Sequence, residues 1–139
     1  MLVDVRRRYI RKTMVDGTLL RDIGYDTIDR IRMENGCWPL QRSDQMSEGA
    51  GWFAGEHYRT GQSHSTDQRF NQLECVGGMS GIHLEGMMRK IILDFMADEP
   101  HRRILIEQGV DIMGVGTHVE ELRNSYYYLI VVVRVKRTG

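Results

Sequence analysis

The sequence has few cysteines and prolines, no net charge and no long hydrophobic run. Its two cysteines, Cys37 and Cys75, lie far apart, which excludes the disulfide framework of small secreted domains, so we expect two free thiols. Nineteen basic and nineteen acidic side chains balance, so neither nucleic acid nor an anionic membrane is expected as a partner. No window has the length of a membrane span, and the N-terminus is charged where a signal peptide is apolar. We therefore expect a chain that is cytoplasmic at synthesis.

A basic segment near the N-terminus is the local exception to this charge balance. Most such segments are solvated surface, and the alternative is that this one contacts a polyanion or an acidic protein partner. The four residues before it, 2–5, fit a short strand as well as an arm that lies on a partner. We divide the 139 residues into an arm or edge strand over 1–20 and one domain over 21–139, which is long enough to bury about two-thirds of its unfolded surface. The basic residues are Arg6, Arg7, Arg8, Arg11 and Lys12.

Helical periodicity predicts four helices in the domain. The first covers 20–34 and ends at Asn35-Gly36, and the second begins after Ser43, which is a good N-cap. Glycines at 49, 51 and 55 interrupt the second helix at about 1 kcal/mol each, which suggests that another backbone packs closely against it. The third covers 80–96, and Pro100 begins a short fourth helix that runs to Gln108.

Strands dominate the last third of the chain, over 111–117 and 125–136. The second of these is apolar on both faces. The odd-numbered residues from Tyr127 to Val135 fill one face, and the even-numbered residues from Tyr126 to Val132 fill the other. Such a strand must be covered on both sides, and the polar connection through Asn124 forms a hairpin that makes the two strands antiparallel. We expect an α+β protein, a three-layer α-β-α sandwich with a mostly antiparallel central sheet. A further strand is expected at Leu73-Glu74-Cys75-Val76.

Two histidines lie in polar turns between these elements. His64 is in the polar turn 62–65, and His101 follows Pro100 at the start of the short helix. If both turns open over one cleft, the two imidazoles meet there. No other chemical site is suggested by the sequence.

Several short motifs follow one another along the chain. In order they are Gly36-x-x-Pro39-Leu40, Ser63-His64, Glu74, His101-Arg102-x-Ile104-Leu105 and Gly114-Val115-Gly116. Their order resembles that of the CAP superfamily, which groups cysteine-rich secretory proteins, antigen 5 and pathogenesis-related proteins, and the chain is most similar to its short bacterial branch. The resemblance covers about 28–135 and implies the same α-β-α sandwich.

The resemblance also implies a cleft lined by two histidines and acidic residues, which holds a divalent metal in some members. Matched position by position, the cleft residues are His64, Glu74, His101 and Asp98, a set that suits zinc with an open coordination position. Four positions depart from the family pattern: Leu73 stands for Gly, Cys75 for Asn, Phe95 for Trp and Asp29 for Asn.

A structural interpretation of the same residues remains open. A His-Arg pair that opens a helix is often structural, with the ring hydrogen-bonded to a carboxylate. His57 lies on an apolar helix face and is left out of the site. No nucleophile-elbow motif occurs, and Ser63 does not face His64 merely because it precedes it, so a hydrolytic triad is not predicted. Cys75 is expected to be a small core residue whose pKa is raised by the neighbouring Glu74.

The leading hypothesis is a non-catalytic CAP-like module that binds protein partners through its loops and basic arm, as a subunit of a larger assembly such as a virion particle. The alternative is a metal-assisted hydrolase of peptides or cell-wall material that uses His64, Glu74 and His101. Binding of a sterol or other apolar ligand, which the resemblance also implies for some relatives, is a third hypothesis. On balance we expect that the chain is not an enzyme.

Overall fold

The computed structural model describes residues 17–64 and 72–139. The basic residues of the predicted arm lie outside the described residues, and the first described helix already begins at Gly17. None of the described helices has the length and apolar character needed to cross a membrane. The elements in chain order are α2 (Gly17–Glu34), β1 (Gln41–Arg42), α3 (Asp44–Thr60), β2 (Leu73–Gly81), α4 (Leu84–Phe95), α5 (Glu99–Leu105), β3 (Ile112–Arg123) and β4 (Tyr126–Lys136).

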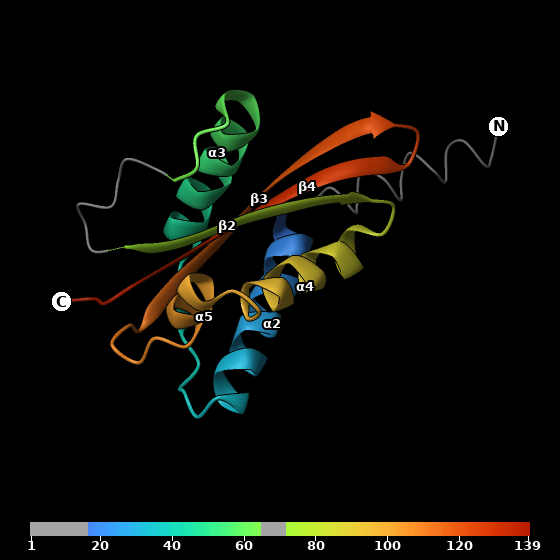
Figure 1. Ribbon diagram of the computed structural model, residues 1–139. Helices are drawn as coiled ribbons and strands as arrows, with labels where there is room; N and C mark the ends of the chain where they lie inside the picture. The colour runs from blue at the N-terminus through green and yellow to red at the C-terminus, as the bar shows by residue number, and fades with distance from the viewer. Residues whose placement is uncertain (1–16, 65–71) are drawn as a thin grey trace.

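The strands form one mixed sheet in the order β1-β3-β4-β2. Strand β4 pairs antiparallel with both β3 and β2, whereas the two-residue β1 pairs parallel with β3. Helix α3 covers one face of the sheet, and α2, α4 and α5 lie on the other (Figure 1). We call these the α3 face and the three-helix face. The predicted α-β-α sandwich with a mostly antiparallel sheet is therefore confirmed.

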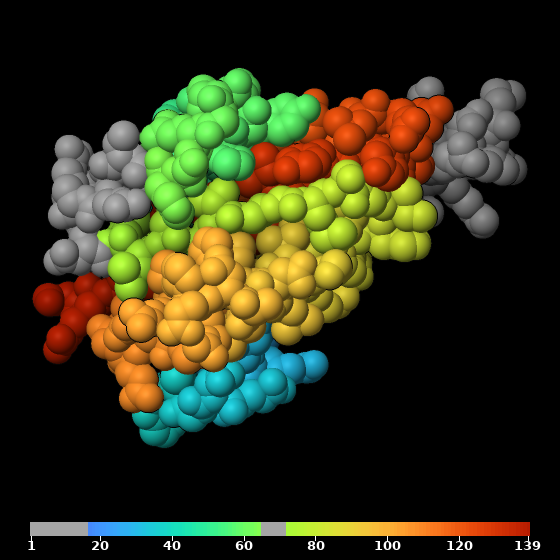
Figure 2. Space-filling model, in the orientation of Figure 1, coloured from blue at the N-terminus to red at the C-terminus, as the bar shows by residue number. Residues whose placement is uncertain are grey.

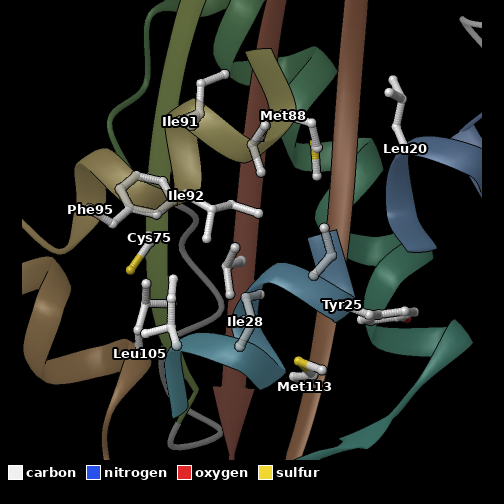
Figure 3. Packing of buried hydrophobic residues seen from close by; sticks show 14 of the residues in the cluster. Leu20, Tyr25, Ile28, Cys75, Met88, Ile91, Ile92, Phe95, Leu105 and Met113 are labelled. Atoms are coloured by element: carbon white, nitrogen blue, oxygen red, sulfur yellow. The ribbon is translucent and has the colours of Figure 1, made fainter. Parts of the chain in front are cut away.

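Strand β4 contributes side chains to the cores on both faces of the sheet, as its alternating pattern predicts. Leu129 and Val131 join the larger core on the three-helix face, whose packing Figure 3 shows. Ile130 and Val132 pack with Phe53 of α3 in a smaller core. The open edge of β2 is visible between these two layers in Figure 2, with α3 above it and α4 and α5 below.

The helix predicted over 80–96 is wrong at its beginning, because α4 begins at Leu84. Ser80 and Gly81 instead continue β2, paired with Tyr128 and Tyr127 of β4. A long neighbouring strand offers every residue of 73–81 a ladder partner, which outweighs the local helical periodicity. The short helix also ends earlier than predicted, at Leu105.

Helix α3 packs on β3 through backbone contact. Its N-cap is Ser43, whose Oγ accepts a hydrogen bond from the Met46 amide at 3.1 Å. A Cβ placed on Gly116 of β3 would overlap the backbone of Gly51 in the helix, and one on Gly114 would lie 2.5 Å from the carbonyl carbon of Met46. The expected close approach of a second backbone is therefore present at Gly51.

Arg32, near the end of α2, binds three backbone carbonyls in the last residue of α5 and in two connections of the chain. Only 2% of the residue is exposed. Its Nε donates to the Trp38 carbonyl at 2.7 Å, and its Nη1 donates to the carbonyls of Leu105 and Glu107 at 2.9 and 2.8 Å. Burial lowers the pKa of Arg32 from its usual value. The guanidinium therefore ties the end of α2 to the segment that links α5 and β3.

Candidate functional site

Glu74 lies at the centre of a buried polar chain on the α3 face. Its side chain, on β2, is only 2% exposed, and Oε2 accepts a hydrogen bond from Nε of Arg134 at 2.9 Å. Arg134 is the directly opposite residue on β4, and its guanidinium lies 5.8 Å from the centroid of the Phe53 ring of α3. The carboxylate is therefore held by a cation that is itself fixed between the sheet and the helix.

His64 extends this chain of polar groups to the surface. Its Nδ1 lies 3.2 Å from the other carboxylate oxygen of Glu74, Oε1, and its side chain is 45% exposed. Nε2 of Gln62 donates to the His64 carbonyl at 2.8 Å. The structure therefore brings two of the predicted site residues, His64 and Glu74, into contact.

His101 and Asp98 form a separate pair on the three-helix face. Asp98 is the N-cap of α5, and its Oδ2 lies 2.7 Å from Nδ1 of His101. The His101 ring lies 5.0 Å from the ring of Phe95, and its carbonyl accepts a hydrogen bond from Sγ of Cys75 at 3.7 Å. Because successive residues of a strand point to opposite faces, Cys75 and Glu74 lie on different sides of β2. The carboxylate partner predicted for His101 is thus Asp98.

These two pairs do not form a metal site. Within 17–64 and 72–139, no three His, Cys, Asp or Glu side chains are placed to hold one metal ion. The Glu74 carboxylate already contacts an imidazole and a guanidinium, and a divalent cation beside Arg134 would be repelled. As placed, His64, Glu74, His101 and Asp98 do not fit one zinc ion, which needs its ligand atoms at about 2.0–2.2 Å.

Cys75 is buried under α5, and its thiol is unreactive at neutral pH. Burial raises the pKa of its thiol to about 12, and the carboxylates of Glu74 and Asp98 add to the effect. A thiol with so high a pKa holds almost no thiolate at neutral pH, so it is a poor nucleophile. Cys75 is therefore the small core residue that the sequence predicts.

Arg134 is the site residue that the sequence reasoning missed. It stands between Val133 and Val135 in a stretch of β4 that is otherwise apolar from Leu129 to Val135. A charge within a strand covered on both faces needs a buried partner, and the opposite strand supplies one acidic residue. That pattern could have indicated the ion pair with Glu74. His57, which was left out of the site, bonds to the Gln62 carbonyl through Nδ1 at 2.6 Å.

Solved structures share this arrangement of helices and sheet. An outer surface protein of Borrelia burgdorferi superposes with a TM-score of 0.54 at 20% identity, over 82% of this chain and 90% of that one. An extracellular protein of Bacillus anthracis that contains an SCP domain gives 0.58 at 16% identity, over 88% and 41% of the two chains. The CAP domain of enterococcal PrgA gives 0.57 at 17% identity, over 82% and 59%. The chain has the CAP fold.

The CAP fold is established here by shape and not by sequence similarity. No protein-family model matches the chain, and no curated protein matches it in sequence. The chain spans less than two-thirds of the Bacillus anthracis and PrgA chains, although it spans most of the Borrelia burgdorferi one. At these identities the likeness defines the architecture, and the role of the domain must be argued from its own side chains.

Proposed function

We propose that this CAP-fold domain binds other proteins and does not catalyse a reaction, and that it serves as a subunit of a larger assembly such as a virion particle. The observation that carries the proposal is the ion pair between Glu74 and Arg134. An acid that binds a metal or transfers a proton must offer an oxygen to that metal or substrate. The oxygens of Glu74 contact Arg134 and His64 instead, and its side chain is almost fully buried.

The position of the second histidine supports the same conclusion. Metal-assisted hydrolysis would need His64 and His101 to act on one water molecule. His64 contacts an acid on the α3 face, whereas His101 contacts Asp98 beside α5 on the other face. Each histidine with its own carboxylate is an arrangement that stabilises local structure.

The exposed tryptophans support a role in protein binding. Trp38 and Trp52 are 86% and 68% exposed. Trp38 and Pro39 line a hollow of about 250 Å³ that Gly36 and Gln108 also border. Tryptophan is enriched among the residues that dominate interface energies, because it buries a large apolar area on binding. The basic arm, Arg6 to Arg8 with Arg11 and Lys12, remains the proposed contact with acidic partners.

Thermal melting with and without metal tests the proposal. Wild type and His101→Ala are each melted in zinc and in chelator, with His57→Ala as the matched histidine control. We expect the wild type to melt at the same temperature in zinc and in chelator, and His101→Ala to be destabilised equally in both. A stabilisation of size RT ln(1 + [Zn]/Kd) that appears only in zinc and is lost in His101→Ala would support the hydrolase instead.

For the assembly role, density-gradient fractionation of the producing cells should recover the wild type with particles and Trp38→Ala mostly as free chains.

A further inference from the structure

We propose that two copies of this chain pair through the free edge of β2, antiparallel, so that the two sheets become one. In the sheet, β2 is an outermost strand. Its nine residues pair with β4 without a register shift, from Leu73 with Val135 to Gly81 with Tyr127. At about 3.3 Å per residue the edge is roughly 30 Å long. The pairing does not rest on the binding role proposed above, because a monomer can bind a partner equally well.

From residue 75 to residue 81, the outer side of β2 is open to pairing within the described part of the chain. In an antiparallel ladder, alternate residues direct their N–H and C=O groups away from the neighbouring strand. No turn, loop or side-chain hydrogen bond in 17–64 or 72–139 reaches the backbone of residues 75–81. Figure 2 shows this strand as a continuous band of surface between α3 and the helices α4 and α5. The edge is therefore open to a further strand.

The opposite edge of the sheet, formed by β1 and β3, carries features that prevent pairing with a further strand, and β2 lacks them. Natural proteins block exposed edges with charged side chains, prolines and bulges. Beyond its short pairing with β1, strand β3 carries Glu120, Glu121 and Arg123, and its register with β4 shifts between Glu121 and Arg123. Strand β2 has no proline and no shift, and its charged residue, Glu74, is paired with Arg134. Protection on one edge alone indicates that the other is used for pairing.

A second copy is the occupant that this edge fits. A closed dimer needs a self-complementary surface, and two antiparallel copies of one strand supply it. Opposite residues of an antiparallel pair project to the same face, so the central residue must pair with itself. The register that pairs all nine residues is centred on Gly77.

This register places large side chains against small ones. Leu73, which is 39% exposed, lies opposite Gly81 of the second copy, and Val76 lies opposite Gly78. Glu74 lies opposite Ser80, so that no like charges meet along the strand. The chain has no net charge, and two copies therefore approach without overall repulsion.

Sedimentation equilibrium of the full chain tests the pairing. From about 1 µM to about 1 mM, the wild-type mass should rise toward twice the 16.2 kDa of one chain. The variant Leu73→Asp/Ser80→Asp places two carboxylates at exposed positions of the edge, one of them opposite Glu74 of the second copy, and should keep the mass of one chain throughout. The control Leu122→Asp, an exposed leucine of β3, should dimerise like the wild type.

Hydrogen exchange gives a second measurement that needs no variant. Amides within 75–81 should exchange more slowly at the high concentration than at the low one, while those of 120–123 should not change. A wild type that stays monomeric over the whole range would overturn the proposal and would leave the edge to a strand of a different protein. A dimer that survives in the double variant, or one that is lost in Leu122→Asp, would overturn it as well.

Discussion

Glu74 and Arg134 determine the chemistry of the α3 face at the scale of single residues. Two opposite charges are buried side by side between β2 and β4, with 2% and 9% of their side chains exposed. Such a pair repays the cost of removing both charges from water only while both partners are present. Removing one partner should therefore lower the free energy of unfolding, whereas replacing both partners by apolar groups need not lower it.

Glu74→Gln should lower the free energy of unfolding by about 3–5 kcal/mol, because it leaves the buried Arg134 guanidinium without a counter-charge. The double variant Glu74→Leu/Arg134→Met should return most of that loss. Urea denaturation of the wild type and both variants measures the difference. A single variant as stable as the wild type would contradict the structural role of Glu74.

Cys75 should make stability fall at alkaline pH. Its pKa rises from an ordinary 9.0 in the unfolded chain to about 12 in the folded protein, so above pH 9 the folded state binds more protons than the unfolded state. The contribution is complete below pH 9 and is lost as the pH rises toward 12. Cys75→Ala should flatten the fall in melting temperature over that range. Equal slopes in the wild type and the variant would refute the assignment.

At the scale of elements, backbone contact sets the distance between α3 and β3. Gly51 and Gly116 face each other with no side chain between them, and Gly114 faces Met46. The separation of helix and strand is therefore fixed by main-chain atoms, and side-chain packing fills only the space on either side.

Gly116→Ala should destabilise the domain by about 3 kcal/mol or more, because the added methyl would overlap the backbone of α3, which can yield only by moving the whole helix. Gly86→Ala is the matched control, since Gly86 lies within α4 and has nothing within 4 Å of its added Cβ. We expect the control to stabilise the protein by about 0.5–1 kcal/mol. Thermal and urea unfolding of both variants check the two signs, and a neutral Gly116→Ala would show that α3 can shift freely.

The elements differ in how far their sequence predicts them. Strand β4 and the N-cap of α3 follow from local pattern alone, because a two-faced apolar strand and a serine cap need no knowledge of their neighbours. The beginning of α4 does not, because residues 80 and 81 are held in β2 by pairing with β4, which is distant in sequence. For the same reason the order of motifs predicts that Glu74 has a polar neighbour, but not that Arg134 is that neighbour.

At the scale of the whole molecule, Arg32 ties α2 to the end of α5 and to two connections at one end of the three-helix face. The sandwich buries an apolar core on each face of the sheet, and the ends of α2 and α5 meet beside the larger one. The carbonyls that Arg32 binds belong to Trp38, in the connection after α2, to the last residue of α5 and to the segment after it. None of these carbonyls lies in a strand, so no ladder could have satisfied them.

Two of these hydrogen bonds join residues 73 and 75 positions apart in sequence. Closing such long loops is entropically costly before the rest of the sheet is assembled, so these bonds should form after the rate-limiting step of folding. Arg32→Ala should then leave the refolding rate nearly unchanged and speed unfolding, a φ-value near zero in stopped-flow kinetics. Arg32 would thus act as a kinetic latch, which governs how long the domain remains folded and has little influence on how fast it folds.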